Sequence, residues 1–151
     1  PPGLASASTR RPLINAVLTR RGIVDYLHAP WEEPRVELHV FGPATLDEDA
    51  HGQLGAQVHQ ADSPEAVIDQ LEAMGCRSVL VEGGGDLIFK LVASGRIQTI
   101  FMTLAPRIIG GVGAPSLADG VGFAPEDIVD FRLVDCEQVG DELYLRYDRK
   151  N

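Results

Sequence analysis

A carboxylate followed directly by three glycines is the feature of this sequence with the clearest chemical potential. Residues 79–87 read Val-Leu-Val-Glu-Gly-Gly-Gly-Asp-Leu. Glycine lets a ligand approach the backbone closely, and exposed N–H groups beside the positive end of a following helix suit a pyrophosphate. The same glycines would also suit a tight turn that needs positive φ and close packing. Because the spacing is neither GxGxxG nor GK[ST], a standard dinucleotide fold and a P-loop are both unsupported.

The carboxylate in this run, Glu82, is the second chemical group of interest. We expect it at the C-terminal end of a central parallel strand, where open α/β sheets form their ligand crevices. There it could accept hydrogen bonds from a ring amide or amine. Glu82 could alternatively cap neighbouring loop N–H groups or be solvated.

Two further segments could contact a ligand. The turn with Pro106, Arg107 and the pair Gly110-Gly111 would let the backbone approach the nicotinamide side of a cofactor, or would serve only as a turn. Arg20 and Arg21 follow the first predicted strand. A guanidinium binds phosphate in a bidentate manner, so they could contact a 2′-phosphate, or they could lie in a solvated loop.

Other kinds of site have little support. The four histidines neither cluster with cysteines nor show HExxH spacing, so we expect no metal. The sequence contains no GxSxG signature, which argues against acyl transfer by a serine nucleophile. We therefore assign no catalytic side chain.

The elements that would position these residues follow an α/β order. A helix is predicted after Asp62 or Ser63, which can cap it, with Pro64 in its first turn and Gly75 at its end. Its apolar residues at positions 67, 68, 71 and 74 share one face. Strands are predicted at Leu13–Leu18 and Val36–Phe41, whereas Gly22–Arg35 is predicted only as an irregular connection.

The next elements predict a parallel unit and a closing hairpin. Ser78–Val81 is predicted as a buried strand, Asp86–Ser94 as a helix that ends at Gly95, and Gln98–Ala105 as a strand, which together would form a parallel βαβ unit. Alternating apolar residues on both sides of Gly140 predict an antiparallel hairpin. The result would be one mixed sheet, parallel at its centre and covered by helices.

Composition narrows the choice of partner and compartment. The chain has 151 residues, a one-domain length, and a formal net charge of −9, which argues against general affinity for nucleic acid or anionic membranes. Two distant cysteines fit neither a disulfide framework nor a CxxC motif. Apolar stretches are too short to span a membrane. We expect a soluble cytoplasmic protein.

An ordered set of motifs resembles a known family. The set resembles the NADPH-dependent pyrimidine reductases of riboflavin biosynthesis from Pro12 to Tyr147. Its members are Ser78 to Gly85 (SVLVEGGG), Leu87, Gly95-Arg96-Ile97, Leu104-Ala105-Pro106, Gly110-Gly111, and a closing hairpin from Arg132-Leu133-Val134 through Leu143 to Tyr147.

The resemblance implies a three-layer, dihydrofolate-reductase-like α/β fold and a homodimer. It also implies that NADPH delivers hydride to the ribosylamino side chain of a pyrimidine 5′-phosphate, 5-amino-6-(5-phosphoribosylamino)pyrimidine, giving the ribitylamino form. By the same resemblance Glu82 would contact the pyrimidine. The residues implied at the cofactor are Gly83, Gly84, Gly85, Asp86, Leu87, Thr19 and Arg20, where Leu18-Thr19-Arg20 stands in place of the Leu-Asp-Ser of many relatives.

The resemblance is incomplete at the start of the domain. Family domains usually open with a Ser-x-Asp-Gly strand and a later Gly-x-x-Thr turn, and neither precedes Pro12 here. We therefore interpret residues 12–151 as the C-terminal two thirds of a reductase domain and residues 1–11 as a linker or loop. Two alternatives stay open, a noncatalytic nucleotide-binding or dimerising remnant and a reductase of another pterin-like substrate.

Overall fold

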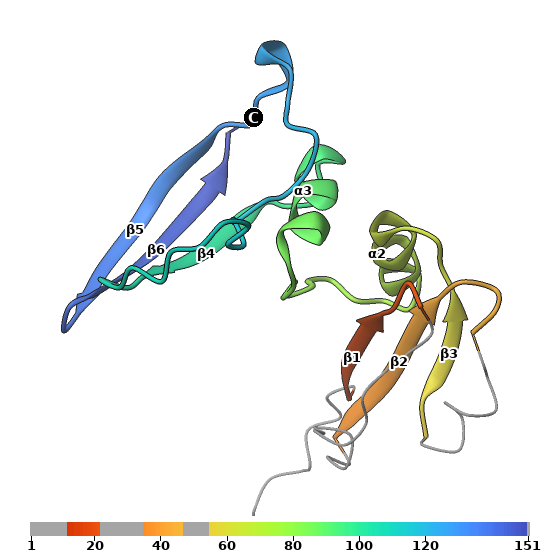
Figure 1. Ribbon diagram of the computed structural model, residues 1–151. Helices are drawn as coiled ribbons and strands as arrows, with labels where there is room; N and C mark the ends of the chain where they lie inside the picture. The colour runs from red at the N-terminus through yellow and green to blue at the C-terminus, as the bar shows by residue number, and fades with distance from the viewer. Residues whose placement is uncertain (1–11, 22–34, 47–54, 151) are drawn as a thin grey trace, which may run out of the picture. The chain divides into compact units, whose positions relative to one another are not determined.

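The computed structural model describes residues 12–21, 35–46 and 55–150, which fall into two compact units, residues 1–67 and 68–151 (Figure 1). The linker expected at residues 1–11 and most of the connection expected at Gly22–Arg35 lie outside the described residues. We describe each unit by itself.

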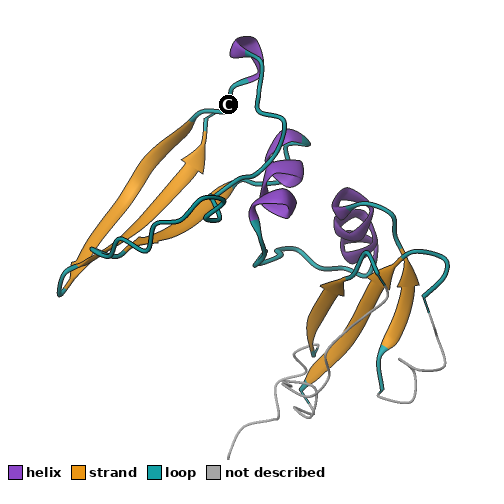
Figure 2. Cartoon of the chain, viewed as in Figure 1, coloured by secondary structure: helices purple, strands orange, loops and turns teal. Residues whose placement is uncertain are grey.

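The first unit contains a parallel sheet of three strands. Its order is β1-β2-β3, with β1 at Leu13–Leu18, β2 at Val36–Gly42 and β3 at Gln57–Gln60 (Figure 2). The predictions for β1 and β2 are confirmed. The short strand β3 was missed, because its sequence Gln-Val-His-Gln offers a single aliphatic residue and no apolar periodicity.

The middle strand β2 is buried on both faces. Leu38 and Val40 point to one face, where they form the core of the unit with Leu46 and Ala56. His39 and Phe41 alternate to the other face and are also buried, with 3% and 0% of their surface exposed. Burial on both faces is the usual state of a central strand in a parallel sheet.

Helix α2, Pro64–Ala73, begins and ends as predicted. The backbone N–H of Ala66 donates to Oγ of Ser63 at 3.3 Å, so Ser63 is the capping residue. Gly75 adopts φ +92°, the left-handed conformation that favours glycine at a helix C-terminus. Val67 and Leu71 are buried, in agreement with the predicted apolar face.

The second unit contains helix α3 at Gly85–Ala93 and an antiparallel sheet of order β4-β6-β5. Its strands are β4 at Thr99–Leu104, β5 at Phe131–Val139 and β6 at Glu142–Arg149, and a 3-10 helix, η1, covers Pro125–Asp127. Gly140, at φ +61°, closes the β5–β6 hairpin. The predicted closing hairpin is therefore confirmed.

The predicted strand at Ser78–Val81 is wrong in this structure. These residues carry no regular secondary structure, and Val79 and Leu80 are 39% and 77% exposed. A strand needs a neighbouring backbone to satisfy its N–H and C=O groups. Among the described residues, β4 pairs with β6 instead, and it runs antiparallel to it.

The absence of that strand changes the architecture. The expected βαβ unit does not form, and the expected single mixed sheet is replaced by one parallel and one antiparallel sheet. The α/β class itself is confirmed, since parallel strands, helices and an antiparallel C-terminal hairpin are all present.

Candidate ligand site at the glycine bend

The glycine bend, residues 82–85, leads into the N-terminus of α3. Gly84 is the N-cap residue, and its carbonyl oxygen accepts hydrogen bonds from the N–H groups of Leu87 at 3.1 Å and Ile88 at 3.2 Å. The N-cap position supplies no side-chain hydrogen bond to the helix. The positive end of the α3 dipole is therefore available to an anion from another source.

The three glycines of the bend have different surroundings. A Cβ added to Gly84 would meet nothing within 4 Å, whereas one added to Gly83 would lie 2.6 Å from Cδ2 of Leu87. Gly85 is buried, and a Cβ there would overlap the carboxylate of Asp119 and lie 2.7 Å from its backbone nitrogen. None of the three has positive φ, so the explanation by positive φ is wrong.

The open backbone at Gly84 fits an approaching phosphate, and Gly85 fits the close-packing explanation. The bend thus combines an exposed face with a packed one. Glu82 is exposed next to the open face, but it does not end a parallel strand as expected, because residues 78–81 form none. Its expected position at a sheet edge is corrected to a position in an exposed loop.

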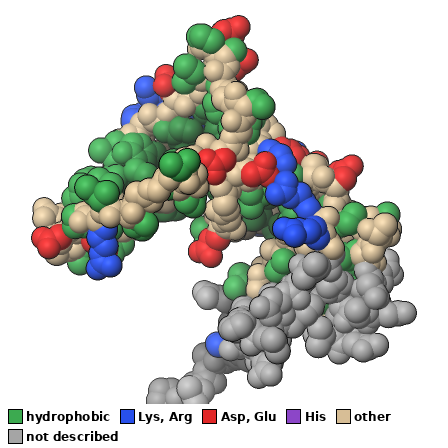
Figure 3. Space-filling model, viewed as in Figure 1, with side chains coloured by type: hydrophobic (Ala, Val, Ile, Leu, Met, Phe, Trp, Pro, Cys, Tyr) green, Lys and Arg blue, Asp and Glu red, His purple; other side chains and the backbone are tan. Residues whose placement is uncertain are grey.

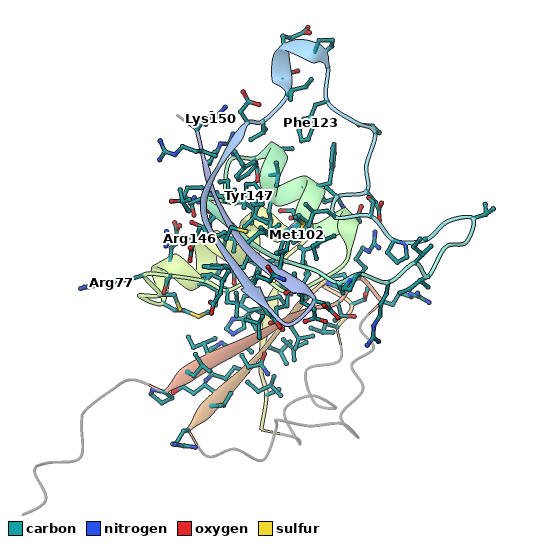
Figure 4. The ribbon with its side chains drawn as sticks, turned by 90° about the vertical axis from the view of Figure 1, so that its left-hand side faces the viewer. Arg77, Met102, Phe123, Arg146, Tyr147 and Lys150 are labelled. Atoms are coloured by element: carbon teal, nitrogen blue, oxygen red, sulfur yellow. The ribbon has the colours of Figure 1, made fainter. Side chains whose placement is uncertain are left out.

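A segment that we call the strap, residues 116–123, packs along α3. Asp119 contacts Gly85, and Gly120 lies so close to Phe89 that an added Cβ would overlap the ring. The rings of Phe89 and Phe123 are 4.9 Å apart with an interplanar angle of 36°. Phe123 is labelled in Figure 4, where it extends from the chain ahead of η1.

The strap also has internal hydrogen bonds. Oγ of Ser116 lies 2.5 Å from Oδ1 of Asp119 and donates to it, and it lies 3.0 Å from the carbonyl oxygen of Ala118. Sequence reasoning missed Asp119, because nothing in its local sequence indicates that it contacts a residue so far back in the chain.

Asp86 and Leu87 form the first turn of α3. Oδ2 of Asp86 lies 3.1 Å from Nζ of Lys90, one helical turn further on. An acidic residue in the first turn and a basic residue in the last both match the direction of the helix dipole. Asp86 and Leu87 directly follow the bend in the chain.

Thr19 and Arg20 belong to the first unit. Thr19 is buried, and its N–H donates to the carbonyl oxygen of Phe41 at 2.9 Å, which extends the β1–β2 pairing by one residue. Arg20 and Arg21 are exposed just after β1. The predicted site residues thus divide between the two units, with Glu82 to Leu87 in the second.

The turn after β4 carries highly exposed apolar side chains. Ile108 and Ile109 are 101% and 95% exposed, and Gly110 and Gly111 have φ values of +68° and +115° that favour glycine. The N–H of Arg107 donates to the carbonyl oxygen of Ala105 at 2.8 Å. The predicted turn is present, and its side chains point into solvent.

The antiparallel sheet of the second unit bears a shallow cavity and many hydrophobic side chains. The space-filling view shows these side chains gathered over the sheet (Figure 3). Arg146 stands over the ring of Phe101, with its Cζ 6.0 Å from the ring centre. The cavity of about 300 Å³ is lined by residues that include Phe101, Thr103, Asp135, Glu137, Tyr144 and Arg146, and Arg146 is labelled in Figure 4.

In the described part of the chain, no helix has the length and apolar character needed to cross a membrane. Within that same part, no three His, Cys, Asp or Glu side chains are grouped to hold a metal ion.

Comparison with known proteins gives a consistent result. Residues 4–145 match the family described as RibD C-terminal domain. The chain is 36% identical over 87 residues to the riboflavin biosynthesis protein RibD of Synechocystis, covering 56% of this chain and 24% of that protein. It is 28% identical over 85 residues to the 2,5-diamino-6-ribosylamino-4(3H)-pyrimidinone 5′-phosphate reductase of Methanothermobacter thermautotrophicus, covering 56% of this chain and 39% of that protein.

Solved structures show the same fold. RibD of Acinetobacter baumannii superposes with a TM-score of 0.73 at 22% identity, over 89% of this chain and 37% of that chain. A deaminase/5-amino-6-(5-phosphoribosylamino)uracil reductase of Thermotoga maritima gives a TM-score of 0.69 at 19% identity. The superposition covers 95% of this chain and 39% of that chain. This likeness confirms the predicted dihydrofolate-reductase-like fold class.

The chain spans about a quarter to two fifths of the length of these relatives. The family match nevertheless covers nearly the whole chain, from residue 4 to residue 145. The glycine bend, α3, the turn after β4 and most of the closing hairpin all lie inside the matched range. The chain therefore belongs to the RibD C-terminal domain family.

Proposed function

We propose that the protein containing this chain is a pyrimidine reductase of riboflavin biosynthesis. It would use NADPH to reduce the ribosylamino side chain of a 5-amino-6-(5-phosphoribosylamino)pyrimidine to the ribitylamino form. The observation that carries this proposal is the match of residues 4–145 to the RibD C-terminal domain family. We infer that residues 12–151 form part of the reductase domain and that residues 1–11 form a linker or loop.

The glycine bend is the proposed position of the cofactor phosphates. Gly83 and Gly84 are exposed, Gly84 has open space beside its Cα, and α3 has no side-chain cap from its N-cap residue. Backbone N–H groups and the helix dipole attract an anion there, which explains how a chain of net charge −9 could bind a polyanion. The residues that would line the phosphates are Gly83, Gly84, Gly85, Asp86 and Leu87. In the first unit, Thr19 and Arg20 are proposed separately as cofactor contacts.

Glu82 is the proposed contact to the pyrimidine. Its exposed carboxylate can accept hydrogen bonds from ring N–H or amino groups, and it directly precedes the backbone proposed for the phosphates. A carboxylate next to the bend would orient the pyrimidine relative to the cofactor. This role is one of binding and orientation.

When bound, NADPH supplies the hydride, so the chain needs to hold the reactants and not to act as a nucleophile. Productive geometry places the donor and acceptor carbons about 3 to 3.5 Å apart. Backbone N–H groups at the bend would fix one reactant and Glu82 would orient the other. The reduction also consumes one proton, which the opened sugar oxygen takes up and which solvent would supply in this scheme, so no nucleophilic side chain is required.

We also infer a homodimer in the cytoplasm. The exposed hydrophobic side chains of the antiparallel sheet favour burial against another surface, among them Phe101, Leu104, Leu133 and Val139. Both cysteines, Cys76 and Cys136, are free thiols, as suits a reducing compartment. Sedimentation of the full protein at several concentrations would test the dimer.

A substitution at Gly84 tests the proposed function. Gly84→Val fills the open space at the bend, whereas Ala93→Val places the same valine side chain at an exposed position near the other end of α3. In fluorescence titrations with NADPH, we expect Gly84→Val to weaken binding by roughly tenfold, about 1.4 kcal/mol, and Ala93→Val to bind as the parent does. The parent should also oxidise NADPH when the ribosylaminopyrimidine phosphate is added.

Two outcomes would contradict the proposal. One is a parent protein that binds no NADPH. The other is a Gly84→Val variant that is folded and binds NADPH with unchanged affinity, which would place the phosphates elsewhere.

A further inference from the structure

We propose that the strap is a latch that a bound anion displaces from α3. In this structure, Asp119 lies against Gly85 at the N-terminus of the helix and would hold the strap there. A phosphate that arrives at the glycine bend would take over from this carboxylate and release the strap. This inference rests on the proposed function, because it assumes that the anion binds at the bend.

The contact between Asp119 and Gly85 carries the first step of the argument. Gly85 is the first residue of α3, and it is buried by both the carboxylate and the backbone of Asp119. A Cβ at Gly85 would come within 2.5 Å of Cγ of Asp119, so any other residue would push the strap away. A negatively charged group thus lies at the positive end of a helix whose N-cap residue offers no side chain.

The second step concerns how Asp119 is held. Ser116 donates to Oδ1, while Oδ2 is the carboxylate oxygen nearest to the position of a Gly85 Cβ. One oxygen is therefore fixed within the strap and the other faces the helix. The Asp119 carboxylate can therefore contact α3 while it stays hydrogen-bonded within the strap.

The strap also makes apolar contacts with α3. Gly120 lies against the ring of Phe89, and Phe123 packs on the same ring with a centroid distance of 4.9 Å. Ala118 and Val121, in the same segment, are exposed, Val121 to 99%. A segment whose residues are mostly exposed has a low free energy of local opening, which suits a strap that moves when a ligand binds.

The third step is the competition between two anions. A phosphate at the bend and the Asp119 carboxylate would draw on the same helix dipole, and their like charges would repel each other. Binding of one therefore weakens the other, and ligand affinity is reduced by the cost of displacing the strap. Removal of the Asp119 charge should remove that cost.

The test compares Asp119→Asn with Asp127→Asn in the full protein. Both substitutions remove one negative charge, but Asp127 is exposed in η1, outside the strap. We expect Asp119→Asn to bind NADPH roughly two- to fivefold more tightly, the range that one charge at a helix end supplies, and Asp127→Asn to bind as the parent does. Inorganic pyrophosphate serves as a second probe that carries only the anion.

Hydrogen exchange of the strap amides provides a readout that is independent of affinity. In the parent, NADPH or pyrophosphate should accelerate exchange at residues 117–122, and Asp119→Asn should show faster exchange there without any ligand. Slower exchange on NADPH binding, or a weaker affinity of Asp119→Asn for NADPH, would overturn the latch while leaving the proposed function intact.

The opposite failure can be told apart. If the parent binds no NADPH, the proposed function fails, and pyrophosphate then decides the latch alone. Faster strap exchange with pyrophosphate would still support the latch, whereas unchanged exchange would overturn it.

Discussion

His39 and His59 form a direct hydrogen bond between neighbouring parallel strands, with 2.8 Å between Nδ1 of His39 and Nε2 of His59. Their rings are stacked with centroids 5.0 Å apart, and Phe41 stacks on His59 at 4.7 Å. Nε2 of His39 is buried and has no hydrogen-bond partner among the residues that the structure describes, and it lies 3.6 Å from Oε2 of Glu37. The more favourable tautomer of His39 carries its proton on Nε2, where the N–H faces the Glu37 carboxylate. Nδ1 of His39 then accepts the hydrogen bond that Nε2 of His59 donates.

The first prediction concerns pH. Burial of the ring and the nearby charge of His39 lower the pKa of His59 from its ordinary value of 6.5. Below that pH the unfolded chain binds a proton that folded His59 resists, so stability should be full above pH 6.5 and fall as the pH drops through the lower folded pKa. Urea unfolding between pH 7.5 and about pH 5 measures this slope.

The control for this prediction is a pair of substitutions on β3. His59→Asn keeps a polar side chain that does not titrate, and it should flatten the slope. Gln57→Asn, at an exposed position of the same strand, should keep the slope of the parent. An unchanged slope in His59→Asn would show that His59 does not control the pH dependence.

The second prediction concerns packing at the glycine bend. Gly85→Ala forces Asp119 and the strap away from α3, and overpacking of this kind costs about 1 to 3 kcal/mol. Gly84→Ala adds the same methyl group in open space and should cost less, roughly 0.5 kcal/mol, because alanine is a weaker N-cap residue than glycine. Equal effects of the two substitutions in urea unfolding would contradict the close contact at Gly85.

The third prediction concerns the cap of α2. Ser63→Ala removes the oxygen that accepts the N–H of Ala66 and should destabilise the chain by about 1 kcal/mol. Asp62, the other residue that could have capped this helix, is exposed, so Asp62→Ala should have a smaller effect. Thermal unfolding of both variants measures the two effects. A larger loss of stability in Asp62→Ala than in Ser63→Ala would show that Asp62 caps the helix and that the assignment to Ser63 is wrong.

The fourth prediction concerns Glu82. Glu82→Gln removes the negative charge but keeps the size of the side chain, so the proposed hydrogen bonds to the pyrimidine should weaken. We expect KM for the ribosylaminopyrimidine phosphate to rise roughly tenfold, because hydrogen bonds to a charged group contribute about 1.5 to 3 kcal/mol. The affinity for NADPH should stay unchanged. Weaker NADPH binding with an unchanged KM would instead assign Glu82 to the cofactor.

Local signals in the sequence were enough to predict several elements. Ser63, Pro64 and Gly75 defined α2, and Gly140 defined the closing hairpin, because capping and turn formation depend on residues a few positions apart. The ordered motifs around the glycine bend also indicated the family that the comparison then confirmed. These features need no knowledge of what packs against them.

Contacts between distant residues could not be read in this way. An apolar run such as Ser78–Val81 forms a strand only where another backbone pairs with it. The strand expected beside it, β4, pairs with β6 instead. The sequence left open whether Gly85 contacts a ligand or packs closely, and the structure places Asp119 of the strap against it.

The sequence by itself thus determined the helices, the hairpin and the family, because these depend on short-range conformational preferences and on ordered motifs. Only the tertiary structure decided which strands pair, which glycine is open and which is packed, and that His39 meets His59. The physical reason is that pairing and packing depend on which groups meet in space. The same local pattern of residues is compatible with many different partners elsewhere in the chain.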